Sequence, residues 1–164
     1  MIDIRQLTVG YQSPLISFSE MELKRGTVYA LIGRNGIGKS TFLKTITGQL
    51  KAMNGTIYLD NRLLSDITFS EIPRYISYVE SHFPLVEFLT AYDYIALGRS
   101  PYTNLVGKLR EEDKLLVGQT IVDLKIEHLR NRFTSELSDG ERQLISIAKA
   151  VVQQTDLIAL DEPT

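Results

Sequence analysis

The sequence contains no cysteine, and this absence excludes three kinds of chemistry at once. The chain cannot have a disulfide framework, a metal site built from thiolates, or a cysteine nucleophile. A protein without cysteine is compatible with a reducing compartment but does not require one.

An excess of charge of either sign is also missing. The 18 Lys and Arg residues against 20 Asp and Glu residues leave a formal charge of −2. This balance gives no electrostatic argument for nucleic acid or anionic lipid as a primary partner. No apolar run approaches the roughly 18–20 residues that cross a bilayer, and the first residues do not resemble a secretory signal. We therefore expect any membrane association to depend on a partner protein.

What the sequence does contain is an alternation of strand and helix patterns. The 164 residues are enough for one domain, or one domain with a small lobe. Apolar periodicity and turn residues predict strands over residues 2–9, 15–24, 27–32, 56–59, 75–79 and 157–160, and helices over 39–50, 91–97, 111–124 and 138–153. The continuous apolar runs 27–32 and 157–160 are typical of strands buried on both faces. The pattern predicts an α/β fold, with a parallel sheet flanked by helices.

A glycine-rich loop lies between the predicted strand 27–32 and the helix that follows it. It reads Gly33-Arg34-Asn35-Gly36-Ile37-Gly38-Lys39-Ser40, which fits the phosphate-loop pattern G-x-x-x-x-G-K-[ST]. Glycines let successive N–H groups point into one concavity, and the start of the helix adds positive potential there. Lys39 can then reach the β- and γ-phosphates, and Ser40 can ligate Mg²⁺. We expect residues 33–41, including Thr41, to bind a nucleotide, with Arg34, Asn35 and Ile37 as spacers.

The last predicted strand, Leu157 to Leu160, is followed by two carboxylates, Asp161 and Glu162. The carboxyl edge of a parallel sheet is where α/β proteins bind ligands. Asp161 is suited to hold Mg²⁺ through water, and Glu162 to polarise the water that attacks the γ-phosphate. Adjacent strand residues point to opposite faces, which favours different roles for the two acids.

A third motif, Leu137-Ser138-Asp139-Gly140-Glu141, precedes an apolar-striped helix. Ser138 with Glu141 three residues later forms a capping-box pattern, which alone would explain both residues. It does not explain Gly140, which costs about 1 kcal/mol against alanine in a helix. Glycine in the first turn permits an anion to approach the N–H groups closely. The residues alone favour neither interpretation.

Together, the order and spacing of these three motifs resemble the ATP-binding-cassette (ABC) ATPase family over nearly the whole chain. The resemblance implies a P-loop NTPase core with a parallel sheet, an N-terminal antiparallel β subdomain and a helical subdomain insertion. It divides the chain into 1–88 (β subdomain and phosphate-loop part of the core), 89–136 (helical subdomain) and 137–164 (signature helix and acidic strand). The family binds ATP and Mg²⁺ between two cassettes paired head to tail.

The family pattern also implies roles for single residues. Ser138, Asp139 and Gly140 would contact the nucleotide held by a second subunit, and Tyr11 would stack on adenine. Asp139 and Glu141 replace the commoner glycine and glutamine. Where the family has a metal-contacting glutamine after strand 75–79, this sequence has Ser81, between Glu80 and His82. An oxygen from Ser81 or Glu80 is the expected substitute, and Ser81 is taken as the metal residue. His82 is better explained as a surface residue.

The chain stops at Thr164, directly after a predicted buried strand, and the family's later γ-phosphate-sensing histidine would lie beyond it. We expect a C-terminally truncated ATPase whose 164 residues alone bind nucleotide but hydrolyse it slowly or not at all.

Segment 94–102 is similar to one in importers of iron–siderophore complexes, haem and vitamin B12. This resemblance implies a cytoplasmic subunit, peripheral on the membrane through permease partners, that never touches the transported compound. Two alternatives remain: a soluble ABC protein acting on ribosomes or DNA, and a nucleotide-binding module without hydrolysis.

Overall fold

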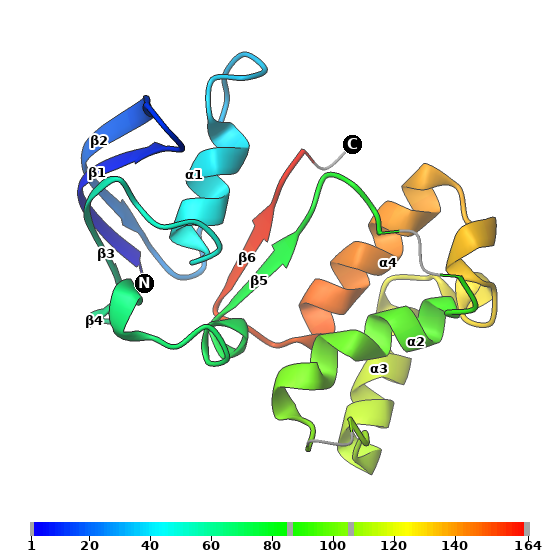
Figure 1. The fold of residues 1–164 in the computed structure, drawn as a ribbon. Coiled ribbons are helices and arrows are strands. Elements are labelled where there is room, and N and C mark those ends of the chain that lie inside the picture. Colours follow the sequence, from blue (N-terminus) through cyan, green and yellow to red (C-terminus); the bar gives the residue numbers. More distant parts are fainter. Residues whose placement is uncertain (1, 85–86, 105–106, 163–164) are drawn as a thin grey trace. The chain divides into compact units, whose positions relative to one another are not determined.

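A computed structural model of the chain describes residues 2–84, 87–104 and 107–162 (Figure 1). It divides into two compact units, Met1–Ile76 and Ser77–Thr164, and each is described by itself. Within the described residues, no helix combines the length and apolarity needed to cross a bilayer.

The first unit contains an antiparallel sheet of four strands in the order β2-β1-β3-β4. Ile4 of β1 pairs with Met21 of β2 on one side and Ile57 of β3 on the other. Ile2, Ile4 and Val9 are at most 2% exposed, so β1 contributes to the core along its length. The strands are β1 (Ile2–Gly10), β2 (Pro14–Leu23), β3 (Asn54–Leu59) and β4 (Arg62–Leu63).

Helix α1 (Lys39–Ile46) belongs to the same unit. Its Phe42 ring packs against Phe18 of β2, with ring centroids 4.7 Å apart. The helix ends four residues before the predicted end at residue 50, because Gly48 adopts a left-handed conformation (φ +73°). The N–H groups of Gln49 and Leu50 then donate to the carbonyl of Lys44, which closes the last turn.

The predicted buried strand over residues 27–32 is not formed. These residues have no strand assignment, and Val28 and Ile32 are 96% and 91% exposed. An apolar run indicates a preference for burial, but a parallel strand also needs a hydrogen-bonded strand at its side. The described strand pairings include none with this segment. The prediction was wrong because periodicity carries no information about neighbours.

The second unit combines a strand pair with a helical cluster. β5 (Ile76–Val79) and β6 (Leu157–Leu160) lie side by side and run in the same direction (Figure 1). β6 is less buried than predicted, since Ile158 and Leu160 are 41% and 37% exposed and only Ala159 is buried. The helices are α2 (Ala91–Ala96), α3 (Glu111–Asp123) and α4 (Asp139–Val152). Their shared core is centred on side chains such as Ile95, Ile121 and Ile145.

A buried ion pair ties the three helices together at one end. After α2 the chain continues as a 3₁₀ helix (Leu97–Tyr102) that carries Arg99. The Arg99 guanidinium lies 2.7 Å from the Asp113 carboxylate on α3 and donates to the carbonyl of Val152, the last residue of α4. Burial alone would raise the pKa of Asp113, but hydrogen bonds from Arg99 and from the Arg110 N–H outweigh it and lower that pKa. The helix with the Ser138 motif at its start is therefore anchored at its other end.

Candidate functional site

The glycine-rich loop of the first unit curls back on itself. Gly36 and Gly38 adopt left-handed conformations, with φ +79° and +110°, which a residue with a Cβ adopts only with strain. The Lys39 ammonium donates to the carbonyls of Gly33 and Arg34, at 3.0 and 3.1 Å. The Lys39 ammonium is thus held over the loop.

The start of α1 has no cap from a side chain. Gly38 is the N-cap residue and makes no side-chain cap hydrogen bond, and the first turn carries no acidic residue. The first N–H groups of a helix need partners, and together with the helix dipole they favour an anion. With Lys39 beside them, these groups form a site suited to phosphate.

The other predicted site residues of this unit lie close to the loop in sequence. Ser40 and Thr41 occupy the first turn of α1, where Thr41 is buried and Ser40 is partly exposed. Arg34, Asn35 and Ile37 are exposed. Tyr11 stands in the turn between β1 and β2 with 64% of its surface exposed, so its ring is open to stacking.

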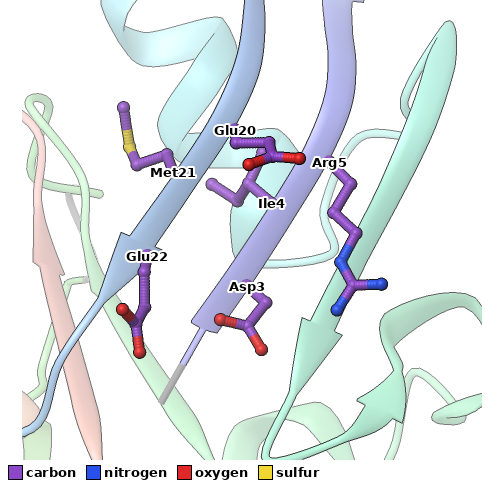
Figure 2. A pocket seen from close by; sticks show the side chains of 6 residues that line it. All are labelled: Asp3, Ile4, Arg5, Glu20, Met21 and Glu22. Carbon is purple, nitrogen blue, oxygen red and sulfur yellow. The ribbon is translucent and has the colours of Figure 1, made fainter.

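A shallow hollow on β1 and β2 is a second feature of the first unit, and Figure 2 shows the side chains that line it. Its volume is about 410 Å³. Three of its six lining residues are acids, Asp3, Glu20 and Glu22, against one cation, Arg5. Carboxylates at this density repel phosphate, so this hollow is not suited to a nucleotide.

In the second unit, the two acids after β6 occupy different environments. Asp161 is only 3% exposed, and its Oδ2 accepts a hydrogen bond from the Tyr78 hydroxyl at 2.8 Å. Glu162 is exposed and has a left-handed backbone (φ +49°), a conformation that costs about 1–3 kcal/mol and is concentrated at functional sites. The two carboxylates therefore differ in burial, and separate roles for them stay a prediction.

The donor chemistry of the predicted metal residues fits Mg²⁺. Ser40, Asp161 and Ser81 all offer oxygen, the ligand that this ion prefers. In the parts of the chain that the structure describes, no group of three His, Cys, Asp or Glu side chains could hold a metal by itself. Mg²⁺ is usually bound by one or two protein ligands together with substrate phosphates and water, so it does not need such a cage.

The start of α4 is capped by a side chain of its own sequence. The N–H and the hydroxyl of Ser138 donate to Glu141 Oε2, at 2.7 and 2.8 Å. In return, the Glu141 N–H donates to Ser138 Oγ at 3.4 Å. The predicted capping box is therefore present. Gly140 has open space where a Cβ would lie.

Two arginines that the motifs did not identify support this helix start. Arg132 lies 2.8 Å from Glu141 Oε1 and also donates to the carbonyl of Glu136. Arg142 contacts Asp139 and the carbonyl of Ser135. The hydrogen bonds from the Ser138 N–H and hydroxyl, and then the charge of Arg132, lower the pKa of Glu141. Arg132 lies nine residues before Glu141, outside any local spacing rule, so the sequence carried no signal for it.

The position expected to replace the family's glutamine follows β5. Ser81 Oγ and His82 Nδ1 lie 3.0 Å apart, and both side chains are exposed. The structure thus gathers residues 33–41 in one loop and helix, and joins Tyr78 to Asp161. Ser138, Asp139 and Gly140 form a separate helix start within the second unit.

Comparison with known proteins supports the same assignment. The family model described as ABC transporter matches residues 17–164. An uncharacterized ABC transporter ATP-binding protein of Methanocaldococcus jannaschii is 36% identical over the whole chain and 57% of its own length. An iron(3+)-hydroxamate import ATP-binding protein of Bacillus subtilis is 29% identical over 99% of the chain and 61% of its own length. The chain therefore spans about three fifths of the length of these relatives.

The fold also matches solved structures. A dimeric ATP-binding cassette in a post-hydrolysis state, bound to ADP and Pi, superposes with a TM-score of 0.83 at 25% identity. The match covers 100% of this chain and 75% of that one. The motifs, the fold and the family match agree. The chain belongs to the ABC transporter family and is related to its ATP-binding proteins.

Proposed function

We propose that the protein is the ATP-binding subunit of an ABC importer and hydrolyses ATP to drive uptake of a metal chelate of the iron–siderophore, haem or cobalamin type. One observation carries the proposal: the start of α1 lacks a side-chain cap, and Lys39 is held over the loop beside it. These features suit the triphosphate of a nucleotide.

Each site residue then has a role. The Lys39 ammonium exchanges the carbonyls of Gly33 and Arg34 for phosphate oxygens, and Tyr11 stacks on the base. Ser40, Asp161 and Ser81 offer oxygens toward Mg²⁺, which neutralises charge on the phosphates when bound. Exposed Glu162 is the general base for the attacking water.

The partner is a second ATPase subunit in a head-to-tail dimer. The dimeric cassette with ADP and Pi supports this proposal, because that protein shares the fold of this chain. Ser138, Asp139 and Gly140 of one subunit would contact the nucleotide bound by the other. Permease subunits would hold the dimer at the cytoplasmic face of the membrane.

The substrate class is supported by the iron(3+)-hydroxamate import relative and by segment 94–102. In this chain that segment carries Arg99, whose buried ion pair anchors the helices. Such a role is structural, which agrees with a subunit that does not touch the transported compound.

ATPase measurements on the native polypeptide that carries this sequence test the proposal. We expect Mg²⁺-dependent hydrolysis that Lys39→Ala and Glu162→Gln each abolish, with nucleotide binding retained only by Glu162→Gln. Unchanged hydrolysis in Glu162→Gln would refute the general-base assignment. ATP binding without any turnover would favour a nucleotide-binding module instead.

A further inference from the structure

The end of the β5–β6 pair contains a side-chain contact that no motif identifies. The Tyr78 hydroxyl donates to Asp161 Oδ2 at 2.8 Å, across 83 residues of sequence. At the next residue of β5, the carbonyl of Val79 accepts a hydrogen bond from the Asp161 N–H at 3.0 Å. The same strand therefore holds both the backbone and the side chain of Asp161.

Because Asp161 is buried, the hydrogen bond from Tyr78 matters for the orientation of its carboxylate. A carboxylate that is 3% exposed has lost most of its water and depends on protein hydrogen bonds to fix its orientation. A phenol on a strand is a rigid donor, since it has only two side-chain torsions and its backbone is held in the sheet. A bond to one carboxylate oxygen also restricts rotation of the other oxygen.

Ser77, the residue before Tyr78 on β5, contacts a different part of the second strand. Ser77 is 1% exposed, and its hydroxyl is used within the strand pair, where it contacts Thr155 and the carbonyl of Leu157. These bonds secure the beginning of β6. Tyr78 instead reaches the residue after the end of β6, where the proposed metal chemistry takes place.

We propose that Tyr78 is a positioning residue that orients the Asp161 carboxylate toward the Mg²⁺ of the bound nucleotide. This inference rests on the proposed function, because it takes Asp161 as a residue that serves the metal. Removing a group that orients a metal ligand typically lowers metal affinity by about 10- to 100-fold. Because Asp161 would act through water, we expect an effect of about tenfold.

The test measures how nucleotide binding depends on Mg²⁺ in the native polypeptide. A fluorescent ATP analogue is titrated in EDTA, and then at fixed concentration against increasing Mg²⁺. Tyr78→Phe should raise the Mg²⁺ concentration for half-maximal enhancement about tenfold and leave binding in EDTA unchanged. Tyr102→Phe is the matched control, because that hydroxyl donates to the backbone carbonyl of Gln153 instead; it should change neither quantity.

A double variant separates positioning from an independent effect. If Tyr78 acts through Asp161, adding Tyr78→Phe to Asp161→Asn should cause no further change in the Mg²⁺ requirement. A normal Mg²⁺ requirement in Tyr78→Phe, together with a raised one in Asp161→Asn, would overturn this inference and leave the proposed function standing. A normal requirement in Asp161→Asn would overturn the metal role of Asp161 and the inference with it. Thermal unfolding of each variant distinguishes these results from loss of the fold.

Discussion

The helices that begin at residues 39 and 139 start in opposite ways. α1 begins at a left-handed glycine, which makes no side-chain cap hydrogen bond, and has no acid in its first turn. α4 begins with a complete capping box and two acids, Asp139 and Glu141, in its first turn. Every helix start leaves N–H groups that need partners. α1 is thus suited to take those partners from a ligand, whereas at α4 the Ser138 side chain supplies one of them, to the Glu141 N–H.

This difference gives the two motifs different requirements for binding phosphate. At α1 the groups that would bind it, Lys39 and the loop N–H groups, belong to one loop and helix of one chain. At α4 the Ser138 hydroxyl already donates to Glu141, so a phosphate there must compete with a carboxylate that is also held by Arg132. In the proposed dimer, the second subunit would deliver the phosphate and make that exchange favourable.

The largest expected effect is at the open helix start. Lys39→Ala should weaken binding of a fluorescent ATP analogue by about 100-fold, because the ammonium makes charge-assisted hydrogen bonds to phosphate that are worth about 1.5–3 kcal/mol. Lys44→Ala, at the other end of the same helix, is the control and should bind normally. Equal losses in the two variants would mean that the loop has no special role.

Gly38→Ala should destabilise the protein by about 1–3 kcal/mol, measured by urea unfolding. The residue has φ +110°, and a Cβ would lie 3.2–3.3 Å from the side chains of Leu15 and Ile16. Gly26→Ala, where φ is +70° and no atom lies within 4 Å of the added Cβ, should cost less. The opposite ranking would contradict the packing of the loop described above.

Ser138→Ala should cost about 1 kcal/mol of stability, because the capped start of α4 loses the acceptor for the Glu141 N–H. Ser138→Thr should retain most of that stability, since threonine keeps the hydroxyl that accepts from the Glu141 N–H and donates to its carboxylate. Thermal unfolding measures both variants. A loss in Ser138→Thr as large as that in Ser138→Ala would show that the capping box does not stabilise this helix.

Gly140→Ala should raise stability by up to about 1 kcal/mol, in contrast to Gly38→Ala. Open space surrounds the position, and its φ is not left-handed. In the proposed function the same variant should weaken ATP-dependent dimerisation, measured by light scattering, because the added methyl group blocks the close approach of a phosphate. Higher stability with normal dimerisation would leave Gly140 without a functional role.

The smallest expected effect is a pH dependence. The pKa of Glu141 is lowered from its ordinary value of 4.5 in the folded protein, so the unfolded chain binds a proton there at higher pH than the folded chain does. The stabilisation by Glu141 is therefore present above that ordinary value and is lost as the pH falls through the folded-state pKa. Urea unfolding in acid should show a shallower pH dependence for Glu141→Gln than for the wild type.

Features set by local spacing were predictable from the sequence. The phosphate loop and the Ser138–Glu141 box depend on residues within eight positions of one another, and the structure places both at the start of a helix. The antiparallel β subdomain and the helices at 91–97, 111–124 and 138–153 were also expected, and their ends moved by one or two residues.

Features that depend on distant neighbours were not predictable. The apolar run 27–32 is exposed, because the described pairings provide no strand beside it. The contact between Tyr78 and Asp161 joins residues 83 positions apart, and the Arg99–Asp113 pair joins a 3₁₀ helix to α3. Such contacts follow from how elements pack, and single-sequence patterns do not carry that information.

Amide hydrogen exchange of the native polypeptide with Glu162→Gln, with and without MgATP, tests the contrast between the two helix starts most directly. At low protein concentration we expect MgATP to protect residues 33–41 and to leave 138–142 unchanged. At concentrations where the dimer forms, both segments should be protected. Protection of 138–142 without dimer formation, or no protection of 33–41 at any concentration, would contradict the account.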